Sequence, residues 1–98
     1  MQKESSSAVH HHTSDHRFEL NVDGATVFAE YKLAPGTIIF DHTVTPGALR
    51  GRGLAARVVE AGLNYARAEH LKVVPQCWYV ADYIRKYPAF QDLLATRA

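Results

Sequence analysis

The sequence predicts one α/β domain of the α+β kind. A three-strand antiparallel meander is followed by a long helix, a parallel fourth strand and short C-terminal helices. Three observations predict this fold: apolar and polar side chains alternate up to residue 44, the apolar spacing becomes helical after Pro46, and a short apolar run follows that helix. A chain of 98 residues has room for one core, because domains of this size bury only about 60 to 65% of their unfolded surface.

Residues 1–16 are predicted to form a disordered N-terminal tail, and residues 17–98 to form the domain. The tail holds three consecutive serines and four histidines but almost no large apolar side chain, so it has little to bury. His10, His11 and His12 are adjacent on this polar segment, which does not preorganise a metal site. We therefore expect no bound metal.

An alternation with a period of two predicts the first three strands. Phe18–Val22 is the first, and Asp23-Gly24 supplies a hairpin turn after it. Thr26–Leu33 is the second, and the turn residues Ala34-Pro35-Gly36 end it. Thr37–Val44 is rich in β-branched and aromatic residues, which predicts a more deeply buried strand.

Helical spacing begins after these strands. A helix over Gly53–His70 would place one apolar face against the core, formed by Leu54, Val58, Ala61, Gly62 and Tyr65. Lys72–Cys77 is predicted as the fourth strand, parallel to the third because strand-helix-strand crossovers are right-handed. Val80–Tyr87 is predicted as a short helix that Pro88 closes, before a final apolar turn with Phe90, Leu93 and Leu94.

The composition excludes several classes of protein. With 11 Lys and Arg against 10 Asp and Glu, the chain lacks the broad basic surface that non-specific nucleic-acid binding needs. Cys77 is the only cysteine, so neither an internal disulfide nor a cysteine-rich zinc site can form. No apolar run approaches the roughly 20 residues of a membrane span. We expect a cytoplasmic protein that binds neither membranes nor nucleic acid.

Residues 45–55 combine three glycines with Arg50 and Arg52 at the point where the long helix begins. Helix N-termini bind anions, and glycines let the backbone approach a phosphate closely. The spacing alone leaves two interpretations open, a pyrophosphate site or a tight loop with solvated arginines. Neither G-x-G-x-x-G nor the P-loop pattern occurs, which disfavours NAD and ATP.

Three segments together resemble a known family. Arg50-Gly51-Arg52-Gly53-Leu54-Ala55 matches the Q/R-x-x-G-x-G/A loop of the GNAT superfamily of N-acetyltransferases, at the same strand-to-helix junction. His42-Thr43 and the strand ending Val73-Val74-Pro75-Gln76-Cys77 resemble the small single-domain members. The resemblance extends over Phe18 to Leu94.

The resemblance implies acetyl-coenzyme A (acetyl-CoA) as the acyl donor. It implies that the pyrophosphate binds the backbone N–H groups of Arg50, Gly51, Arg52, Gly53, Leu54 and Ala55. It also implies that the pantetheine arm of coenzyme A (CoA) is lined by Thr43, Val44 and Thr45, and that a backbone N–H near Val44 faces the thioester carbonyl.

Cys77, His42 and Tyr83 are the candidate catalytic residues. Cys77 follows the fourth strand, next to the expected thioester, as a nucleophile, a proton donor or a packing residue. His42 is the only histidine in a predicted strand, and histidine is the side-chain type best suited to base catalysis near neutral pH, unless its role is structural. Tyr83 stands where the superfamily often places a tyrosine that protonates the departing thiolate; the alternative is packing.

The sequence also departs from the family. Related sequences carry Glu directly after His-Thr, where this chain has Val44, and the N-x-x-A and G-F features of larger members are absent. The helices that build their acceptor pocket are absent too. We therefore expect an open acceptor side, suited to a macromolecular amine or to a homodimer that completes the pocket.

We interpret the chain as an acetyl-CoA-dependent N-acetyltransferase for an unidentified amine. The alternatives are a CoA- or acyl-CoA-binding module with little catalysis, and a small domain that binds phosphate groups or nucleic acid through its arginines.

Overall fold

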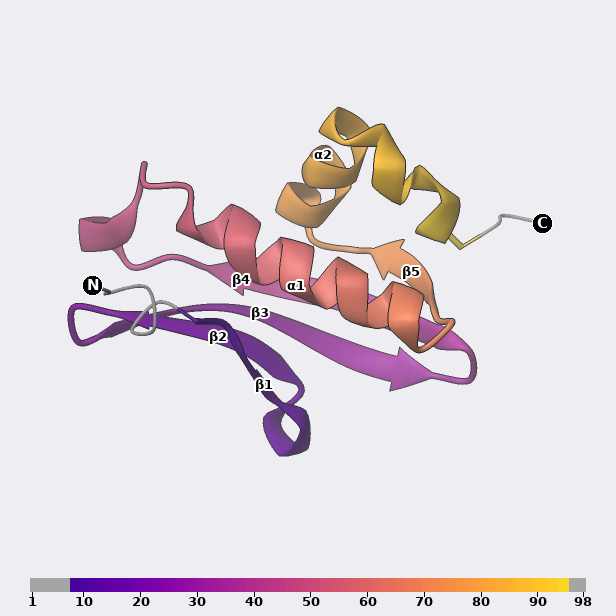
Figure 1. Cartoon of the computed structure of the whole chain (residues 1–98), viewed down its shortest axis with the longest axis horizontal. Helices are drawn as coiled ribbons and strands as arrows, with labels where there is room; N and C mark the ends of the chain where they lie inside the picture. The colour runs from indigo at the N-terminus through magenta and orange to yellow at the C-terminus, as the bar shows by residue number, and fades with distance from the viewer. Residues whose placement is uncertain (1–7, 96–98) are drawn as a thin grey trace.

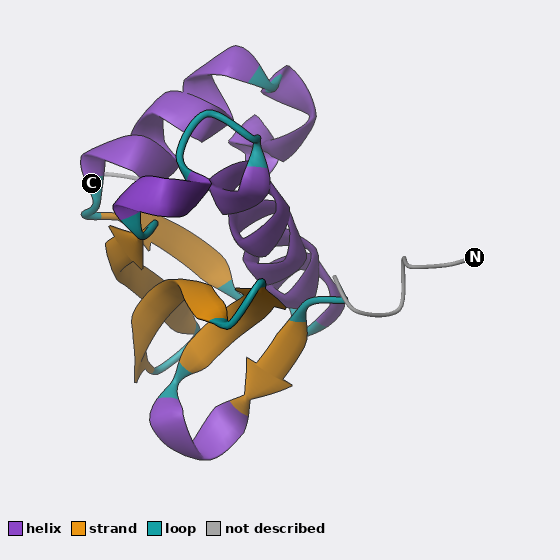
Figure 2. Ribbon diagram, turned by 90° about the vertical axis from the view of Figure 1, so that its left-hand side faces the viewer, coloured by secondary structure: helices purple, strands orange, loops and turns teal. Residues whose placement is uncertain are grey.

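The computed structural model describes residues 8–95, which form a five-stranded sheet with the long helix packed across it (Figure 1, Figure 2). The strands lie in the order β1-β2-β3-β4-β5. The elements are β1 (His10–His12), η2 (Thr13–Asp15), β2 (Arg17–Val22), β3 (Ala25–Ala34), β4 (Thr37–Val44), η3 (Gly47–Leu49), α1 (Leu54–Ala68), β5 (Lys72–Pro75), α2 (Trp78–Lys86) and η4 (Pro88–Leu93).

The predicted strand pairing is confirmed. Strands β2, β3 and β4 form an antiparallel meander, and β5 pairs in parallel with β4. The turn between β2 and β3 has φ angles of 53° at Asp23 and 81° at Gly24. Positive φ at both central residues is the geometry that Asp-Gly favours in a two-residue hairpin.

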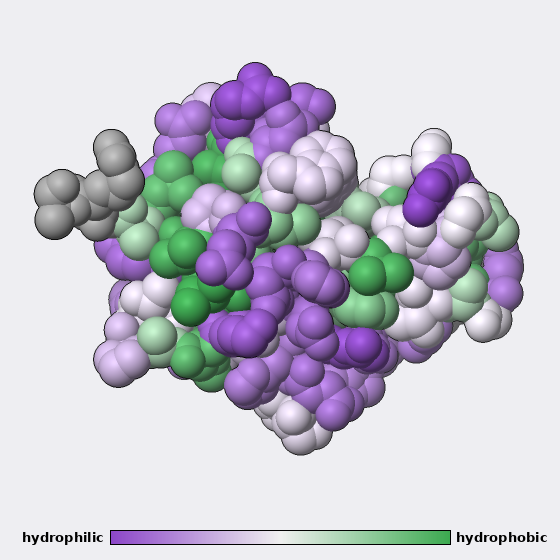
Figure 3. Space-filling view, turned by 180° about the vertical axis from the view of Figure 1, so that it is seen from behind, coloured by the Kyte–Doolittle hydropathy of each residue, from purple (hydrophilic) through white to green (hydrophobic). Residues whose placement is uncertain are grey.

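The core lies between α1 and one face of the sheet. Side chains of β2, β3 and β4 reach this face at alternate positions, and α1 covers them with its apolar side. The buried residues of these elements are Phe18, Leu20, Val27, Ala29, Tyr31, Ile38, Phe40, Val58, Val59, Leu63 and Ala66. A band of hydrophilic residues crosses the molecule when it is seen from behind (Figure 3).

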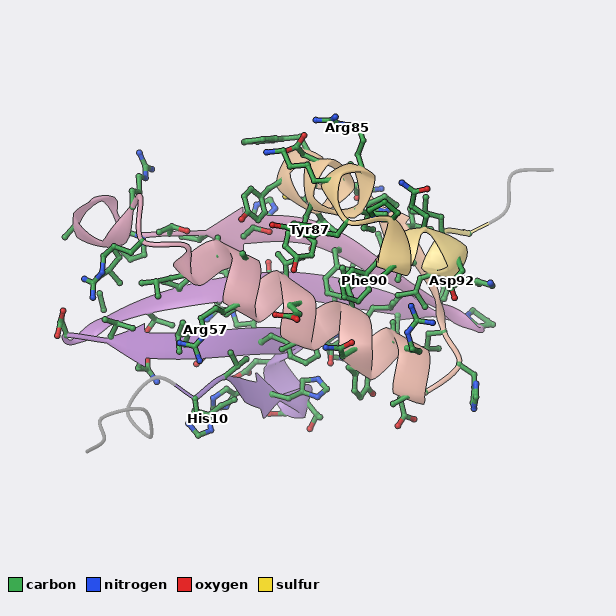
Figure 4. The ribbon with its side chains drawn as sticks, turned by 45° about the horizontal axis from the view of Figure 1, so that its top comes forward. His10, Arg57, Arg85, Tyr87, Phe90 and Asp92 are labelled. Carbon is green, nitrogen blue, oxygen red and sulfur yellow. The ribbon has the colours of Figure 1, made fainter. Side chains whose placement is uncertain are left out.

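The prediction of a disordered tail is wrong for residues 8–16, because β1 pairs antiparallel with β2. His11 stacks on Phe18 with ring centroids 4.1 Å apart and meets the Tyr65 ring edge-on at 4.5 Å. His10 is exposed (Figure 4). The imidazole of His11 thus supplies the ring that anchors the segment, although the composition of the segment is polar. Residues 1–7 of the predicted tail lie outside the described residues.

The histidines do not form a metal centre in this arrangement. Among residues 8–95, no group of three or more His, Cys, Asp or Glu side chains is placed to hold a metal ion. Instead, Nε2 of His11 lies 2.6 Å from the Tyr31 hydroxyl, and His12 contacts Glu19 at 3.3 Å.

We expect the stability of the domain to fall as the pH drops below about 6.5. Burial lowers the pKa of His11, and the nearby His12 and His16 lower it further. The folded state therefore binds fewer protons at this site than the unfolded chain does. The stabilisation that neutral His11 contributes is complete at pH values above its pKa in the unfolded chain. It is lost as the pH falls toward the lowered pKa of His11 in the folded state.

Urea unfolding at about pH 7.5 and about pH 5.5 measures this dependence. His11→Phe keeps a ring in the site without a titrating group, so it should flatten the change in midpoint. His10→Gln alters an exposed histidine on the same strand and should leave most of the change in place. An equal pH dependence in wild type and His11→Phe would contradict the assignment.

The C-terminal elements pack beside β5 and α1. The backbone N–H of Gln76 donates to the Val74 carbonyl and turns the chain. As a result β5 ends at Pro75, not at Cys77 as predicted, and α2 begins at Trp78, not at Val80. Arg67 of α1 holds η4 through both carboxylate oxygens of Asp92, at 2.8 and 3.0 Å (Figure 4). Across residues 8–95, no helix has the length and apolar character needed to cross a membrane.

Candidate functional site

Strands β4 and β5 separate at one end of the sheet. Their pairing extends to Phe40 opposite Pro75, and the Cys77 N–H still donates to the Phe40 carbonyl at 2.9 Å. Beyond this bond β5 gives way to α2, whereas β4 continues to Val44. The gap that results is flanked by the last residues of β4 on one side and the start of α2 on the other.

An irregularity in the pairing of β4 decides which of its residues face this gap. Tyr31 pairs with Phe40, but Glu30 pairs with His42, so Asp41 is an extra residue in β4. Such a bulge reverses the alternation of side chains beyond it. Thr43, opposite buried Ala29, therefore lies on the face that α1 covers, and His42 and Val44 lie on the other face.

The loop between β4 and α1 forms the second wall of the site. We call residues 47–53 the glycine loop; η3 begins it, and Gly51 and Gly53 have φ angles of 80° and 72°. A Cβ placed on either glycine would meet nothing within 4 Å, so the backbone here borders open space. Because α1 begins at Leu54, the N–H groups of its first turn have no acceptor within the helix.

These walls enclose a cavity of about 580 Å³. Figure 3 shows a notch in the surface between the lobe that carries the glycine loop and the lobe formed by α2. The residues that line the cavity are Thr43, Thr45, Leu49, Arg50, Gly51, Gly53, Leu54, Ala55, Cys77, Trp78 and Tyr79. Arg50 carries the only formal charge among them, so the cavity suits an anion.

Seven of the nine residues predicted for cofactor binding line this cavity: Thr43, Thr45, Arg50, Gly51, Gly53, Leu54 and Ala55. Val44 lies on the other face of β4 and is 38% exposed. The side chain of Arg52 reaches Asp23 in the β2–β3 turn, with 3.5 Å between Nη1 and Oδ2. Neither of these two residues is among those that line the cavity.

The three predicted catalytic side chains lie in three different environments. Cys77 lines the cavity, and its Sγ lies 3.4 Å from Oγ1 of Thr43 across the gap between the strands. The His42 ring is exposed on the opposite face of the sheet, with Nδ1 2.7 Å from the Asp41 carbonyl. Because a carbonyl only accepts, Nδ1 is the donor and the neutral ring has its lone pair at Nε2.

Tyr83 faces the core side of α2 and not the cavity. It is 9% exposed, and its ring packs 4.5 Å from that of Tyr87. One helical turn earlier, Tyr79 does line the cavity. Burial raises the pKa of both phenols, so both keep their protons at neutral pH.

Sequence reasoning misses Leu49, Trp78 and Tyr79 as cavity residues. One signal for Tyr79 is available, since residues four apart share a helix face and Tyr83 is a predicted site residue. The predicted helix begins at Val80, two residues after the observed start of α2, so Tyr79 falls outside it. Leu49 is buried in η3, an element that no periodicity marks.

Comparisons with known proteins agree with this architecture. Residues 17–93 match the family model described as GCN5-related N-acetyl-transferase. Protein NATD1 of Xenopus tropicalis is 32% identical over 97 residues, covering 95% of this chain and 88% of that protein. Protein NATD1 of Homo sapiens is 35% identical over 71 residues, covering 72% of this chain and 62% of that protein.

A solved structure shows the same fold. The NMR structure of a GCN5-like protein from Staphylococcus aureus superposes with a TM-score of 0.75 at 22% identity, covering 96% of this chain and 93% of that one. The family match covers most of the chain and includes the strands, glycine loop and helices that form the cavity. The chain therefore belongs to the GCN5-related N-acetyltransferase family.

Proposed function

We propose that the chain binds acetyl-CoA in this cavity and transfers the acetyl group to a primary amine. The observation that carries the proposal is that one cavity joins the N-terminus of α1 to the gap between β4 and β5. Membership of a family named for N-acetyl transfer supports it. The family assignment does not favour the alternative of a phosphate- or nucleic-acid-binding domain.

The residues at the two ends of the cavity fit the two ends of this ligand. The N–H groups of Leu54 and Ala55, together with Arg50, would bind the pyrophosphate. Thr43 and Thr45 would line the pantetheine arm along β4. The backbone N–H of Val44, between them, is our candidate donor to the thioester carbonyl.

When bound, acetyl-CoA supplies an acetyl group activated as a thioester. Transfer forms a bond between the amine nitrogen and the acetyl carbon and breaks the carbon–sulfur bond, so the amine loses a proton and the sulfur gains one. Tyr79 holds a phenolic proton in the cavity wall and is our candidate donor to the sulfur. Cys77 is the candidate nucleophile or alternative donor. Because the His42 ring lies on the opposite face of the sheet from the cavity, its Nε2 would accept the amine proton only through solvent water.

We expect Tyr79→Phe to lower the rate of thiol release about 100-fold, because a positioned acid contributes roughly 100-fold or more. Acetyl-CoA affinity should change little, since the ring stays in the wall. Steady-state kinetics with a thiol reagent measures both. Tyr83→Phe removes the hydroxyl that lies outside the cavity and should keep most of the activity. If Tyr83→Phe lowered the rate of thiol release more than Tyr79→Phe, Tyr83 and not Tyr79 would be the proton donor to the sulfur.

A thermal-unfolding comparison of acetyl-CoA, ATP, NADPH and an oligonucleotide tests the proposed function. Acetyl-CoA alone should raise the Tm, because only a ligand that binds the folded state stabilises it. Thiol release with a panel of amines then tests turnover. A raised Tm without thiol release would support the alternative of a CoA-binding module with little catalysis. Stabilisation by the oligonucleotide and not by acetyl-CoA would contradict both.

A further inference from the structure

Trp78 is the most exposed large apolar side chain among the described residues, at 76%. It is the first residue of α2 and lines the cavity, with its ring perpendicular to that of Tyr79 at 5.9 Å. A tryptophan normally contributes to stability by burying its large ring. Here most of the ring remains in water at the mouth of the cavity, so its contribution to the fold is small.

Trp78 is adjacent in the chain to the end of the cavity where β4 and β5 separate. It follows Cys77 directly, and the Sγ of Cys77 contacts Thr43, where β4 and β5 separate. In the proposed function this is the thioester end, and the pyrophosphate lies at the other end, by Leu54 and Ala55. As the direct neighbour of Cys77 in the chain, Trp78 is assigned in this proposal to the end where an acceptor meets the acetyl group, and the experiment below tests the other assignment, contact with the adenine of CoA.

The lining residues also limit how the cavity can attract an amine. A primary alkylamine is an ammonium ion in neutral water. An Asp or Glu carboxylate is the side chain that can form a charge-assisted hydrogen bond with it. None of the residues that line the described cavity is Asp or Glu, and the one charged residue is Arg50. The π-faces of Trp78 and Tyr79 are the groups in this wall that attract a cation.

The geometry points to Trp78 as the residue that selects the acceptor, by holding a primary alkylammonium group of the lysine side-chain class against its indole face. This inference rests on the proposed function. The exposed ring and open mouth suit an amine at the end of a flexible chain, which enters while the rest of its molecule stays outside. Trp78 would act by binding the acceptor, with no part in bond making or proton transfer. The bound ammonium group first releases one proton to solvent water at the open mouth, because only the neutral amine attacks the thioester.

The experiment uses Nα-acetyl-lysine amide as the acceptor probe with saturating acetyl-CoA. Trp78→Ala should raise the KM for the probe roughly 5- to 20-fold, the range of a partly desolvated cation–π contact, and leave kcat within about twofold. Trp78→Phe keeps an aromatic face and should recover most of the KM. Tyr87→Leu is the matched control, because Tyr87 is also an exposed aromatic at the end of α2, at 50%, but does not line the cavity.

Intrinsic fluorescence gives a second readout, because Trp78 is the only tryptophan of the chain. The probe should quench it saturably near its KM. An unchanged KM in Trp78→Ala would overturn the inference. The inference would also be overturned if CoA quenched the fluorescence and 4′-phosphopantetheine did not, because the Trp78 ring would then contact the adenine of CoA. The rise in Tm caused by acetyl-CoA is measured on the same proteins. If acetyl-CoA did not raise the Tm of the wild type, the proposed function would be contradicted. If it did, but the KM of Trp78→Ala were unchanged, only the role of Trp78 would be contradicted.

Discussion

Gly62→Ala is expected to destabilise the domain by about 1 kcal/mol, although alanine favours helices more than glycine does. Gly62 is buried in α1, and a Cβ placed on it would lie 2.8 Å from both Cε1 and Cζ of Phe40. Phe40 is 1% exposed in the centre of the core, so its ring has no free space to enter. Overpacking of this kind costs about 1 to 3 kcal/mol or more, which exceeds the gain of about 1 kcal/mol in helix propensity.

Urea unfolding measures this change, and a loss of about 1 kcal/mol should lower the Tm by roughly 5 °C in a domain of this size. Phe40→Leu provides the control, because the smaller side chain leaves room for the new methyl group. In that background Gly62→Ala should be neutral or stabilising. A stabilising effect of Gly62→Ala in the wild type would show that α1 can move away from β4 at little cost.

Gly53→Ala is expected to weaken acetyl-CoA binding about tenfold, or about 1.4 kcal/mol. Gly53 is the N-cap of α1 and has a φ of 72°. A left-handed conformation costs other residues about 1 to 2 kcal/mol, so the alanine variant should shift the glycine loop and the N–H groups that follow it. Asn tolerates this conformation better, so Gly53→Asn should lose less affinity.

Gly36→Ala is the matched control for this prediction. Gly36 has a φ of 68°, and a methyl group added to it would meet nothing within 4 Å, as at Gly53, but it lies in the β3–β4 turn. It should lose comparable stability and keep the wild-type affinity for acetyl-CoA. Calorimetric titration of both variants separates the two effects. Equal losses of affinity would mean that the change acts through global stability and not through the loop.

The fold is predictable because its signals are local. The alternation in Thr37–Val44 and the apolar face of α1 each follow from a repeat in the sequence, and these elements occur where the repeats are. The position of the glycine loop is also predictable, since glycines at a helix start mark a turn, although their spacing alone does not tell a pyrophosphate site from a tight loop. Strand β1 is not, because its anchor is a histidine, a residue that counts as polar until Phe18, Tyr31 and Tyr65 surround it.

Site geometry is less predictable than site location. The predicted helix begins at Val80 and omits Tyr79, whereas in the structure Tyr79 lines the cavity and Tyr83, one turn later, is buried. One extra residue in β4, Asp41, places His42 on the opposite face from Cys77. Errors of one or two residues matter here because side chains alternate every residue in a strand and turn by about 100° per residue in a helix.

The sequence by itself determined the order of the strands and helices from β2 onward, the place of the glycine loop before α1 and the resemblance to the family. Each depends on residues that are neighbours in the chain, whose periodicity and backbone preferences act over a few positions. Only the tertiary structure decided which side chains share the cavity, that β1 joins the sheet, and that Trp78 stays exposed at the cavity mouth. Those outcomes depend on contacts between residues far apart in the chain, where packing and strand register outweigh local preference.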